Sequence, residues 1–256
     1  MTPRTLNCQV TAVEDLTPDV FRVRLEGRAE AMAHAPGQFL ELKLDDQTWV
    51  PFSIASAHAG DGALELHIQH WPEHENSVRL RELVVVAQHL TVRLPGGECV
   101  LDPTSRRPLL LLAAGTGFAQ MKAIVEGSLR ESPKRPIALW WAARERRDLY
   151  LESLPHQWAE QHENVVFHVV TEVEPELPVS GVRVRSHRGR IDQALAAELV
   201  DVSGHDVYLS GSPGMVYACV DVLASLGLAP NRVFADAFAY APREPLVPLV
   251  GSLRGI

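Results

Sequence analysis

Cysteine is scarce in this sequence: only three occur among 256 residues, at Cys8, Cys99 and Cys219, and they lie far apart. A structural zinc site, an iron–sulfur cluster or a disulfide framework would need cysteines paired at short spacing. We therefore expect none of these groups in this sequence and interpret each cysteine as a small buried hydrophobic residue. Isolated thiols fit a reducing compartment, so the sequence predicts a cytoplasmic protein.

Excess positive charge and long apolar runs are also missing. The 24 Lys and Arg are outnumbered by 32 Asp and Glu, which gives a formal net charge of −8 and makes sequence-independent binding to nucleic acid unexpected. No apolar run approaches the roughly 20 residues that span a bilayer. The first residues lack the hydrophobic region of a signal peptide. With 46% hydrophobic residues, the chain can instead form the core of one large domain or two of ordinary size.

The histidines do not supply an obvious metal site either. His67, His70 and His74 have the spacing of ligands on one face of a helix. The stretch 63–69 alternates like a β-strand, however, and on a strand His67 and His70 would point to opposite faces. We expect no metal ion at this cluster.

Residues 1–103 have the pattern of short strands separated by turn residues, which favours a small antiparallel barrel. One helix interrupts the pattern near 76–84, with Asn76 as its expected N-cap. The expected strands are 8–13, 20–25, 38–44, 51–55, 63–69 and 89–94.

From residue 108 to 240 strands and helices alternate, which predicts a doubly wound α/β domain with a parallel sheet. The polar, proline-flanked stretch 102–108 is interpreted as the linker, and 241–256 as a tail on the surface or on a partner. The expected strands are 109–114, 137–142, 165–170, 206–210 and 233–235, and the expected helices are 118–130, 149–161, 191–199 and 215–226.

The most informative stretch is LLLLAAGTGFAQ, residues 109–120. A buried strand breaks into Gly115-Thr116-Gly117, called the glycine turn below, and a helical pattern follows. Backbone N–H groups and the helix dipole at such a turn favour an anion, which points to a phosphate-bearing cofactor. The turn is not the G-x-G-x-x-G fingerprint, because Gln120 occupies the third glycine position, and a purely structural role remains an equal alternative.

Three motifs in order carry a family resemblance. They are PFSIAS at 51–56, AGTG at 114–117 and LSGSPGM at 209–215. A barrel followed by a doubly wound sheet with these motifs resembles the ferredoxin–NADP reductase superfamily, whose patterns are R-x-[YF]-[ST], the dinucleotide turn and C-G-P-x-x-M. The stretches 65–68, 114–118, 144–150 and 236–240 are most similar to stand-alone NAD(P)H:flavin reductases. Over residues 7–240, the resemblance implies an antiparallel β-barrel for flavin (FAD, FMN or riboflavin) and an α/β domain for NADH or NADPH.

The resemblance also implies roles for particular residues. The hydroxyl of Ser53 would hydrogen-bond flavin N5 and so serve as the catalytic group, while Phe52 is as consistent with a core position as with a flavin contact. Arg144 would hold the adenosine ribose or a 2′-phosphate, whereas Arg146 and Arg147 are equally interpreted as a solvated loop. The residues expected to bind flavin or dinucleotide are Pro51, Phe52, Ser53, Ile54, His67, Ile68, Gly115, Thr116, Gly117, Arg144, Gly211, Met215 and Asp236.

Three departures from the family pattern affect what the protein can bind. Val50 stands where the family has the Arg that binds the flavin phosphate. Ser210 replaces the cysteine of the third motif, and the glycine turn lacks the usual proline after it. The missing Arg predicts loose flavin binding, with weak discrimination among riboflavin, FMN and FAD.

The sequence thus predicts an NAD(P)H-dependent flavin reductase that transfers a hydride from nicotinamide C4 to flavin N5. One alternative is a flavin-containing reductase component that delivers electrons to a separate ferredoxin or oxygenase, since this sequence has no iron–sulfur pattern of its own. Another is a non-catalytic redox-sensing or assembly module. The expected partners are small molecules, with an electron-acceptor protein as a further possibility.

Overall fold

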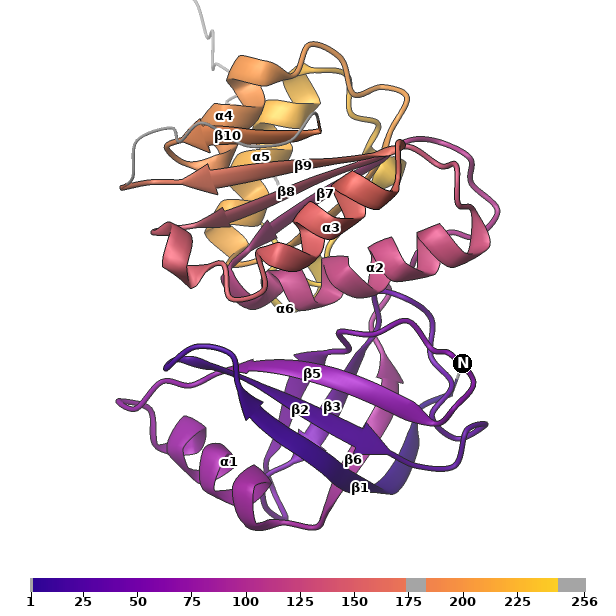
Figure 1. Cartoon of the computed structure of the whole chain (residues 1–256), viewed down its shortest axis with the longest axis vertical. Coiled ribbons are helices and arrows are strands. Elements are labelled where there is room, and N and C mark those ends of the chain that lie inside the picture. Colours follow the sequence, from indigo (N-terminus) through magenta and orange to yellow (C-terminus); the bar gives the residue numbers. More distant parts are fainter. Residues whose placement is uncertain (1, 174–182, 244–256) are drawn as a thin grey trace, which may run out of the picture.

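The computed structural model describes residues 2–173 and 183–243. Figure 1 shows two bodies stacked along the long axis, a curled sheet from the N-terminal half and a helix-flanked sheet from the C-terminal half. Helix α2 (Phe118–Glu131) lies on the side of the second body that faces the first. Its Gln120 and Lys122 donate hydrogen bonds to the backbone oxygens of Gly37 and Ala55, so the two halves are in direct contact.

The N-terminal half is a barrel of antiparallel strands in the spatial order β4-β3-β6-β1-β2-β5. A bridge between Ile54, directly after β4, and Leu66 of β5 joins the two edge strands and closes the sheet. The antiparallel barrel expected from the alternating pattern is therefore confirmed. Its strands are β1 (Arg4–Asp15), β2 (Val20–Glu26), β3 (Phe39–Lys43), β4 (Trp49–Ser53), β5 (Ala63–Gln69) and β6 (His89–Gly96).

Helix α1 (Glu75–Val86) follows β5 and packs Leu80 and Val84, one turn apart, against the barrel core. The prediction of its start was wrong, because the helix begins one residue earlier and His74 occupies the N-cap position instead of Asn76. The His74 side chain makes no capping hydrogen bond, so the sequence signal for an N-cap was absent where the helix starts.

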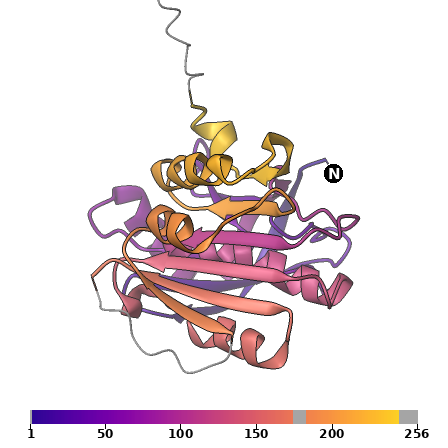
Figure 2. The same cartoon turned by 90° about the horizontal axis from the view of Figure 1, so that it is seen from above.

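The C-terminal half is a parallel sheet in the order β10-β9-β8-β7-β11-β12, as Figure 2 shows from above. The alternation of strands and helices predicted this doubly wound fold correctly. Its strands are β7 (Leu109–Ala114), β8 (Ile137–Ala143), β9 (Val165–Thr171), β10 (Val184–Arg188), β11 (Asp206–Ser210) and β12 (Val233–Phe234). Its remaining helices are α3 (Ser153–Gln161), α4 (Ile191–Glu198), α5 (Pro213–Ser225) and α6 (Ala237–Tyr240).

Both faces of this sheet are covered, which explains the unbroken apolar run of β7. Leu109 and Leu111 pack in the core under α2 and α3, whereas Leu110 and Leu112 pack in the core under α4 and α5. A strand buried on both faces has no polar alternation. Adjacent tryptophans of β8 divide in the same way, Trp141 to the first core and Trp140 to the second.

Two expectations for this half were wrong. Strand β10 was missed, because its sequence VRSHR is polar and only its first residue is buried. The helix expected from 149 begins at Ser153 instead, since Leu149 and Tyr150 are buried in the loop that precedes it.

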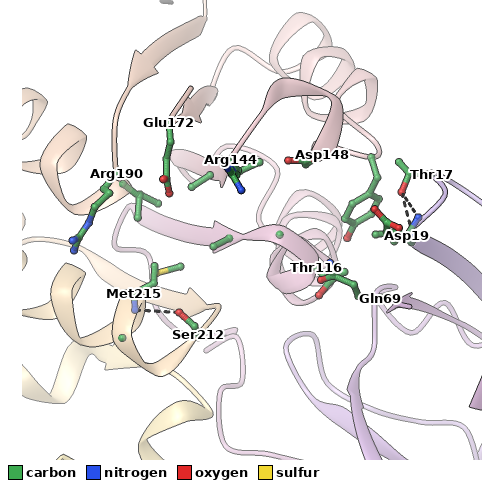
Figure 3. A pocket seen from close by; sticks show the side chains of 18 of the residues that line it. Thr17, Asp19, Gln69, Thr116, Arg144, Asp148, Glu172, Arg190, Ser212 and Met215 are labelled. Atoms are coloured by element: carbon green, nitrogen blue, oxygen red, sulfur yellow. Dashed lines mark hydrogen bonds between the residues drawn. The ribbon is translucent and has the colours of Figure 1, made fainter. Parts of the chain in front are cut away.

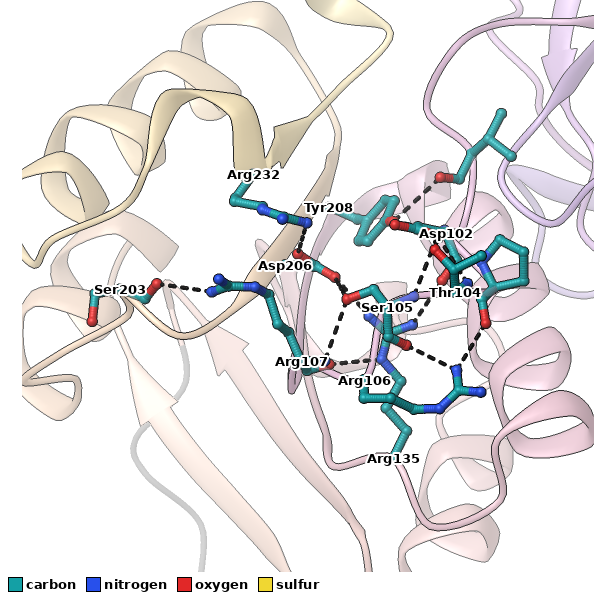
Figure 4. Close-up of polar contacts among 12 residues, drawn as sticks. Asp102, Thr104, Ser105, Arg106, Arg107, Arg135, Ser203, Asp206, Tyr208 and Arg232 are labelled. Atoms are coloured by element: carbon teal, nitrogen blue, oxygen red, sulfur yellow. Dashed lines mark hydrogen bonds and ion pairs between the residues drawn. The ribbon is translucent and has the colours of Figure 1, made fainter.

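The linker between the halves is held by a buried ion pair at the edge of the sheet opposite the strands' carboxyl ends. Arg135 lies 2.7 Å from the carboxylate of Asp206, and both side chains are at most 2% exposed. The Arg135 guanidinium also donates to the backbone oxygens of Asp102 and Arg107 in the linker (Figure 4). The path of the linker is thus fixed, while the exact domain limits at 103 and 108 stay a prediction.

Other expectations concern the whole chain. The three cysteines are buried and free. Within the described residues, no group of three or more His, Cys, Asp or Glu is arranged to hold a metal ion, and no helix is long and apolar enough to cross a membrane. Most of the predicted tail, from residue 244 onward, lies outside the described residues.

Candidate active site

The strand order of the parallel sheet creates one crevice. From β7 the chain moves outward through β8, β9 and β10 on one side and returns to β11 on the other. Ligands of open α/β sheets bind where the strand order reverses, beyond the carboxyl ends of the strands. In this protein those ends are the glycine turn after β7 and Gly211-Ser212, which follow Ser210 at the end of β11.

One cavity, of about 560 Å³, lies between the barrel and this crevice and is called the barrel cavity below. The β4 segment from Val50 to Ser53 forms one wall, and the start of α1 with Trp71 forms another. The sheet domain closes it with the glycine turn and the loop after β11. Its lining is mostly apolar or neutral, which suits a large planar ring system.

A second cavity, of about 610 Å³, lies over the carboxyl ends of the parallel strands and is called the sheet cavity. In Figure 3, Arg144 and Glu172 reach in from the loops after β8 and β9, while Ser212, the N-cap of α5, and Met215 of α5 face them. This shape and position suit an elongated ligand lying across the strand ends.

The two cavities share one set of walls. Each is lined by Gln69 of the barrel, by Ala114, Gly115 and Thr116 at the end of β7, and by Ser212. Ligands that fill both cavities would therefore meet beside the glycine turn. The arrangement can bring a reactive atom of one ligand against a reactive atom of the other, which is what a direct transfer between them requires.

Ser53 ends β4 and lines the barrel cavity. Within the described residues its hydroxyl makes no hydrogen bond. A hydroxyl that faces a cavity without a protein partner is available to a ligand, as the prediction for Ser53 requires.

The two glycines of the glycine turn lack side chains for different reasons. A Cβ at Gly117 would clash with the backbone oxygen of Ser210, so this glycine allows the two loops of the crevice to approach. The sequence also led us to expect a dinucleotide to pass against Gly117; that contact stays a prediction, and the close approach of Ser210 is a separate reason for the glycine. Gly115 has a φ of +52°, and a Cβ there would enter open space on the cavity side.

Charge is distributed unequally between the cavities. Among the described residues, no Arg or Lys lines the barrel cavity. In the sheet cavity, Arg190 is bound to Asp192 at 3.0 Å, whereas the Arg144 side chain is exposed and makes no hydrogen bond or ion pair within the described residues. The carboxylates of the sheet cavity are those of Asp19, Asp148, Glu172 and Asp192.

Ten of the residues expected to bind ligand line one cavity or both. The barrel cavity has Pro51, Phe52, Ser53, His67, Gly117 and Gly211, the sheet cavity has Arg144 and Met215, and both have Gly115 and Thr116. Their specific ligand contacts remain predictions.

Three expected residues line neither cavity. Ile54, directly after β4, and Ile68 of β5 are at most 1% exposed, because both side chains point into the barrel core. Asp236 accepts a hydrogen bond from Gln120 and from the backbone N–H groups of Glu98 and Cys99, so it links α2 to the end of the barrel. Burial, only partly opposed by these hydrogen bonds, raises the pKa of its carboxyl.

The structure adds residues that the sequence did not identify. Trp71 is 47% exposed at the wall of the barrel cavity, and Tyr150, Glu172 and Asp192 line the sheet cavity. Tyr150 lies within one of the stretches that carry the resemblance, but nothing local distinguished its role. For Trp71 the only sequence signal available was a tryptophan shortly after the strand pattern of 63–69.

Comparisons with known proteins agree with this geometry. Residues 7–100 match the family described as oxidoreductase FAD-binding domain, and residues 111–221 match the oxidoreductase NAD-binding domain. The chain is 32% identical over 228 residues to reductase component 1 of terephthalate 1,2-dioxygenase from Comamonas sp, covering 88% of this chain and 66% of that protein. It therefore spans about two thirds of the length of that relative.

Two further similarities bear on the site. An NAD(P)H-flavin reductase from Vibrio harveyi is 28% identical over 242 residues, covering 92% of this chain and 99% of that protein. Among solved structures, the ferredoxin reductase in carbazole 1,9a-dioxygenase matches with a TM-score of 0.77 and 27% identity, covering 93% of this chain and 70% of that one.

Proposed function

The chain belongs to the ferredoxin–NADP reductase superfamily, whose members join an FAD-binding to an NAD-binding oxidoreductase domain, and on this premise we propose that it is an NAD(P)H-dependent flavin reductase. The barrel cavity takes the flavin, and the sheet cavity takes NADH or NADPH. The bound pair supplies the chemistry, a hydride passing from nicotinamide C4 to flavin N5.

One observation carries this proposal: the two cavities share the walls formed by Gln69, the end of β7 and Ser212. The protein's main task is then to hold two rings in contact and exclude water between them. Ser53 offers its free hydroxyl on the flavin side of the junction. Gly115 leaves the junction open, because no side chain projects from it.

We propose further that the flavin is a substrate that enters and leaves. No described residue of the barrel cavity supplies a positive charge for a flavin phosphate. The nearby arginines of α1 are engaged elsewhere, since Arg79 pairs with Asp45 at 2.9 Å and Arg81 with Asp15 at 2.5 Å. The ring and ribityl chain, which riboflavin, FMN and FAD share, would supply most of the affinity.

The test is a titration of the purified protein with riboflavin, FMN and FAD, together with NADH oxidation in the presence of each. The expected result is a protein isolated without stoichiometric flavin that reduces all three. Val50→Arg should tighten FMN and FAD about ten- to a hundredfold, because one charge-assisted phosphate contact adds roughly 1.5–3 kcal/mol. Riboflavin should not respond, and Val50→Gln, long but uncharged, is the matched control.

Two results would contradict the proposal. A preference of the unmodified protein for FAD of more than about a hundredfold over riboflavin would show that another group holds the phosphates and that the flavin is retained. No oxidation of NADH or NADPH with any flavin would favour the non-catalytic alternative.

A second candidate is a reductase component that passes electrons to a separate ferredoxin or oxygenase. It is favoured by the 32% identity to the terephthalate dioxygenase reductase component. That function requires a retained flavin, so the same titration separates the two candidates. An electron-acceptor protein stays a proposal, as does a cytoplasmic location, which the three free thiols support.

A further inference from the structure

A buried chain of polar side chains crosses from the barrel to the sheet domain beside the two cavities. Glu65 and His67 project from the same face of β5, the face opposite the barrel core. The sheet domain covers this face with Tyr150, which follows β8, and with Lys122 of α2. Both faces of β5 are therefore buried, and the polar face is matched by polar partners.

The contacts are short and their donors can be assigned. The Nε2 atom of His67 lies 2.7 Å from Glu65 Oε1, and its Nδ1 atom lies 3.0 Å from the Tyr150 hydroxyl. Lys122 Nζ lies 3.4 Å from the same Glu65 oxygen and 2.9 Å from the backbone oxygen of Ala55. With Glu65 ionised and His67 neutral, Nε2–H donates to Glu65 and the Tyr150 hydroxyl donates to Nδ1.

The charges around His67 fit this assignment. Burial, the largest influence, lowers the pKa of His67 against the opposing effect of Glu65, and Lys122 and Arg22 lower it further. For Glu65, burial alone would raise the pKa, but the hydrogen bond from His67 and the charges of Lys122, His67 and Arg22 bring it to about 2. The charged groups facing His67 are therefore Glu65 from its own strand, Arg22 from β2 and Lys122 from α2.

The same series of side-chain contacts extends to the glycine turn. The ring of Tyr150 packs edge-on against Trp141, with ring centroids 5.1 Å apart, and Trp141 Nε1 donates to the backbone oxygen of Gly115 at 3.0 Å. His67 lines the barrel cavity, and Tyr150 lines the sheet cavity. A continuous set of contacts thus connects the wall of the barrel cavity to the wall of the sheet cavity.

We propose that His67 and Tyr150 are positioning residues for hydride transfer, which fix the barrel cavity against the glycine turn through the His67–Tyr150 hydrogen bond. The inference rests on the proposed function and adds an interdomain device to it. Each ligand binds within its own cavity, so affinities for flavin and for coenzyme should depend little on this bond. The rate of transfer depends on the distance between the two rings and should depend on it strongly.

The experiment uses the full chain and four variants. Tyr150→Phe removes only the hydroxyl, and His67→Gln keeps a donor for Glu65 but no acceptor at the position of Nδ1. The third variant combines both changes. Tyr208→Phe is the control, because it also removes a buried tyrosine hydroxyl, one that donates to Val100 O, but Tyr208 lines neither cavity.

Stopped-flow reduction of riboflavin by NADH gives the limiting rate of hydride transfer, and separate titrations give the dissociation constants. The expected result is a loss of roughly tenfold in the limiting rate for each single variant, with both dissociation constants changed less than about twofold in Tyr150→Phe. The double variant should lose about tenfold as well and not about a hundredfold, because both changes break the same bond. Tyr208→Phe should keep the rate even where its thermal unfolding midpoint falls.

The pH dependence provides a readout that a general loss of packing would not change. Burial lowers the pKa of His67, so the acid limb of the rate in the unmodified protein should lie below pH 6.5, the usual pKa of His. Protonated His67 cannot accept from Tyr150, so the hydrogen bond as assigned is lost and the geometry that it fixes should change. This acid limb should vanish in Tyr150→Phe. Unchanged limiting rates, or multiplicative losses in the double variant, would overturn the proposal, whereas an unmodified protein without any hydride transfer would instead refute the proposed function.

Discussion

Replacing Ser53 by Ala tests the centre of the proposed site. The Ser53 hydroxyl lines the barrel cavity and makes no hydrogen bond within the described residues. Its removal leaves no buried donor or acceptor without a partner, so the free energy of unfolding should change by less than about 0.5 kcal/mol. Any large effect must then come from the bound flavin.

The expected effect on the reaction follows from one hydrogen bond. A bond from the hydroxyl to flavin N5 that strengthens as the ring is reduced is worth roughly 1–3 kcal/mol. Ser53→Ala should therefore slow hydride transfer by about ten- to a hundredfold. The dissociation constant of the oxidised flavin should change much less, because the ring still packs in the cavity.

The measurement is a single-turnover reduction of flavin by NADH at saturating concentrations of both, accompanied by urea unfolding. Ser225→Ala is the matched control, because it removes a hydroxyl that donates to Val222 O at the end of α5, away from both cavities. A single-turnover rate in Ser53→Ala equal to that of the unmodified protein would refute the assignment of Ser53. A large loss of stability would show that the hydroxyl has a structural partner instead.

Other changes test separate parts of the structure. Gly115→Ala places a methyl group in the open space of the shared wall, so the KM for NADH, measured by steady-state kinetics, should rise several-fold. Because the residue has a φ of +52°, the free energy of unfolding, measured with urea, should also fall by about 1 kcal/mol. NADH should be preferred to NADPH by more than about tenfold in kcat/KM, because the 2′-phosphate enters a cavity with four carboxylates and two guanidiniums among its described residues. Glu172→Gln should reduce this ratio of the two kcat/KM values. A preference of the unmodified protein for NADPH would contradict the prediction. Burial, with the charges of His187 and Arg185, lowers the pKa of His168 to about 3, so its neutral form stabilises the fold fully above pH 6.5 and the contribution is lost as the pH falls toward 3. His168 should therefore lower the free energy of unfolding by about 1.4 kcal/mol for each pH unit below 6.5, measured between pH 7 and 5. An equal slope in His168→Phe would show that His168 does not contribute to this pH dependence.

Local pattern was sufficient for most of the architecture. The period-two pattern of residues 63–69 and the unbroken apolar run of 109–114 predicted β5 and β7 with the bounds that the structure has. Near neighbours encode such elements, because alternation and burial act over a few residues. Strand β10 escaped prediction because its polar residues follow no burial pattern.

The local pattern indicated the glycine turn, and the family resemblance indicated Ser53 and Arg144. All of them line the cavities, and their ligand contacts stay predictions. Side chains that meet across the two halves could not be predicted in this way. Ile54 and Ile68 were expected at a ligand but face the barrel core, and Asp236 instead ties α2 to the end of the barrel.

What the sequence by itself determined is therefore the two folds, their order and the strand ends at which the candidate site is proposed. Only the tertiary structure decided how the halves meet. His67 and Tyr150 are 83 residues apart, and nothing in either local pattern indicates the hydrogen bond between them. Gly117 likewise owes its lack of a side chain to the backbone of Ser210, on a different strand. Such contacts depend on the packing of whole elements, and periodicity along one segment carries no information about the segment that will cover it.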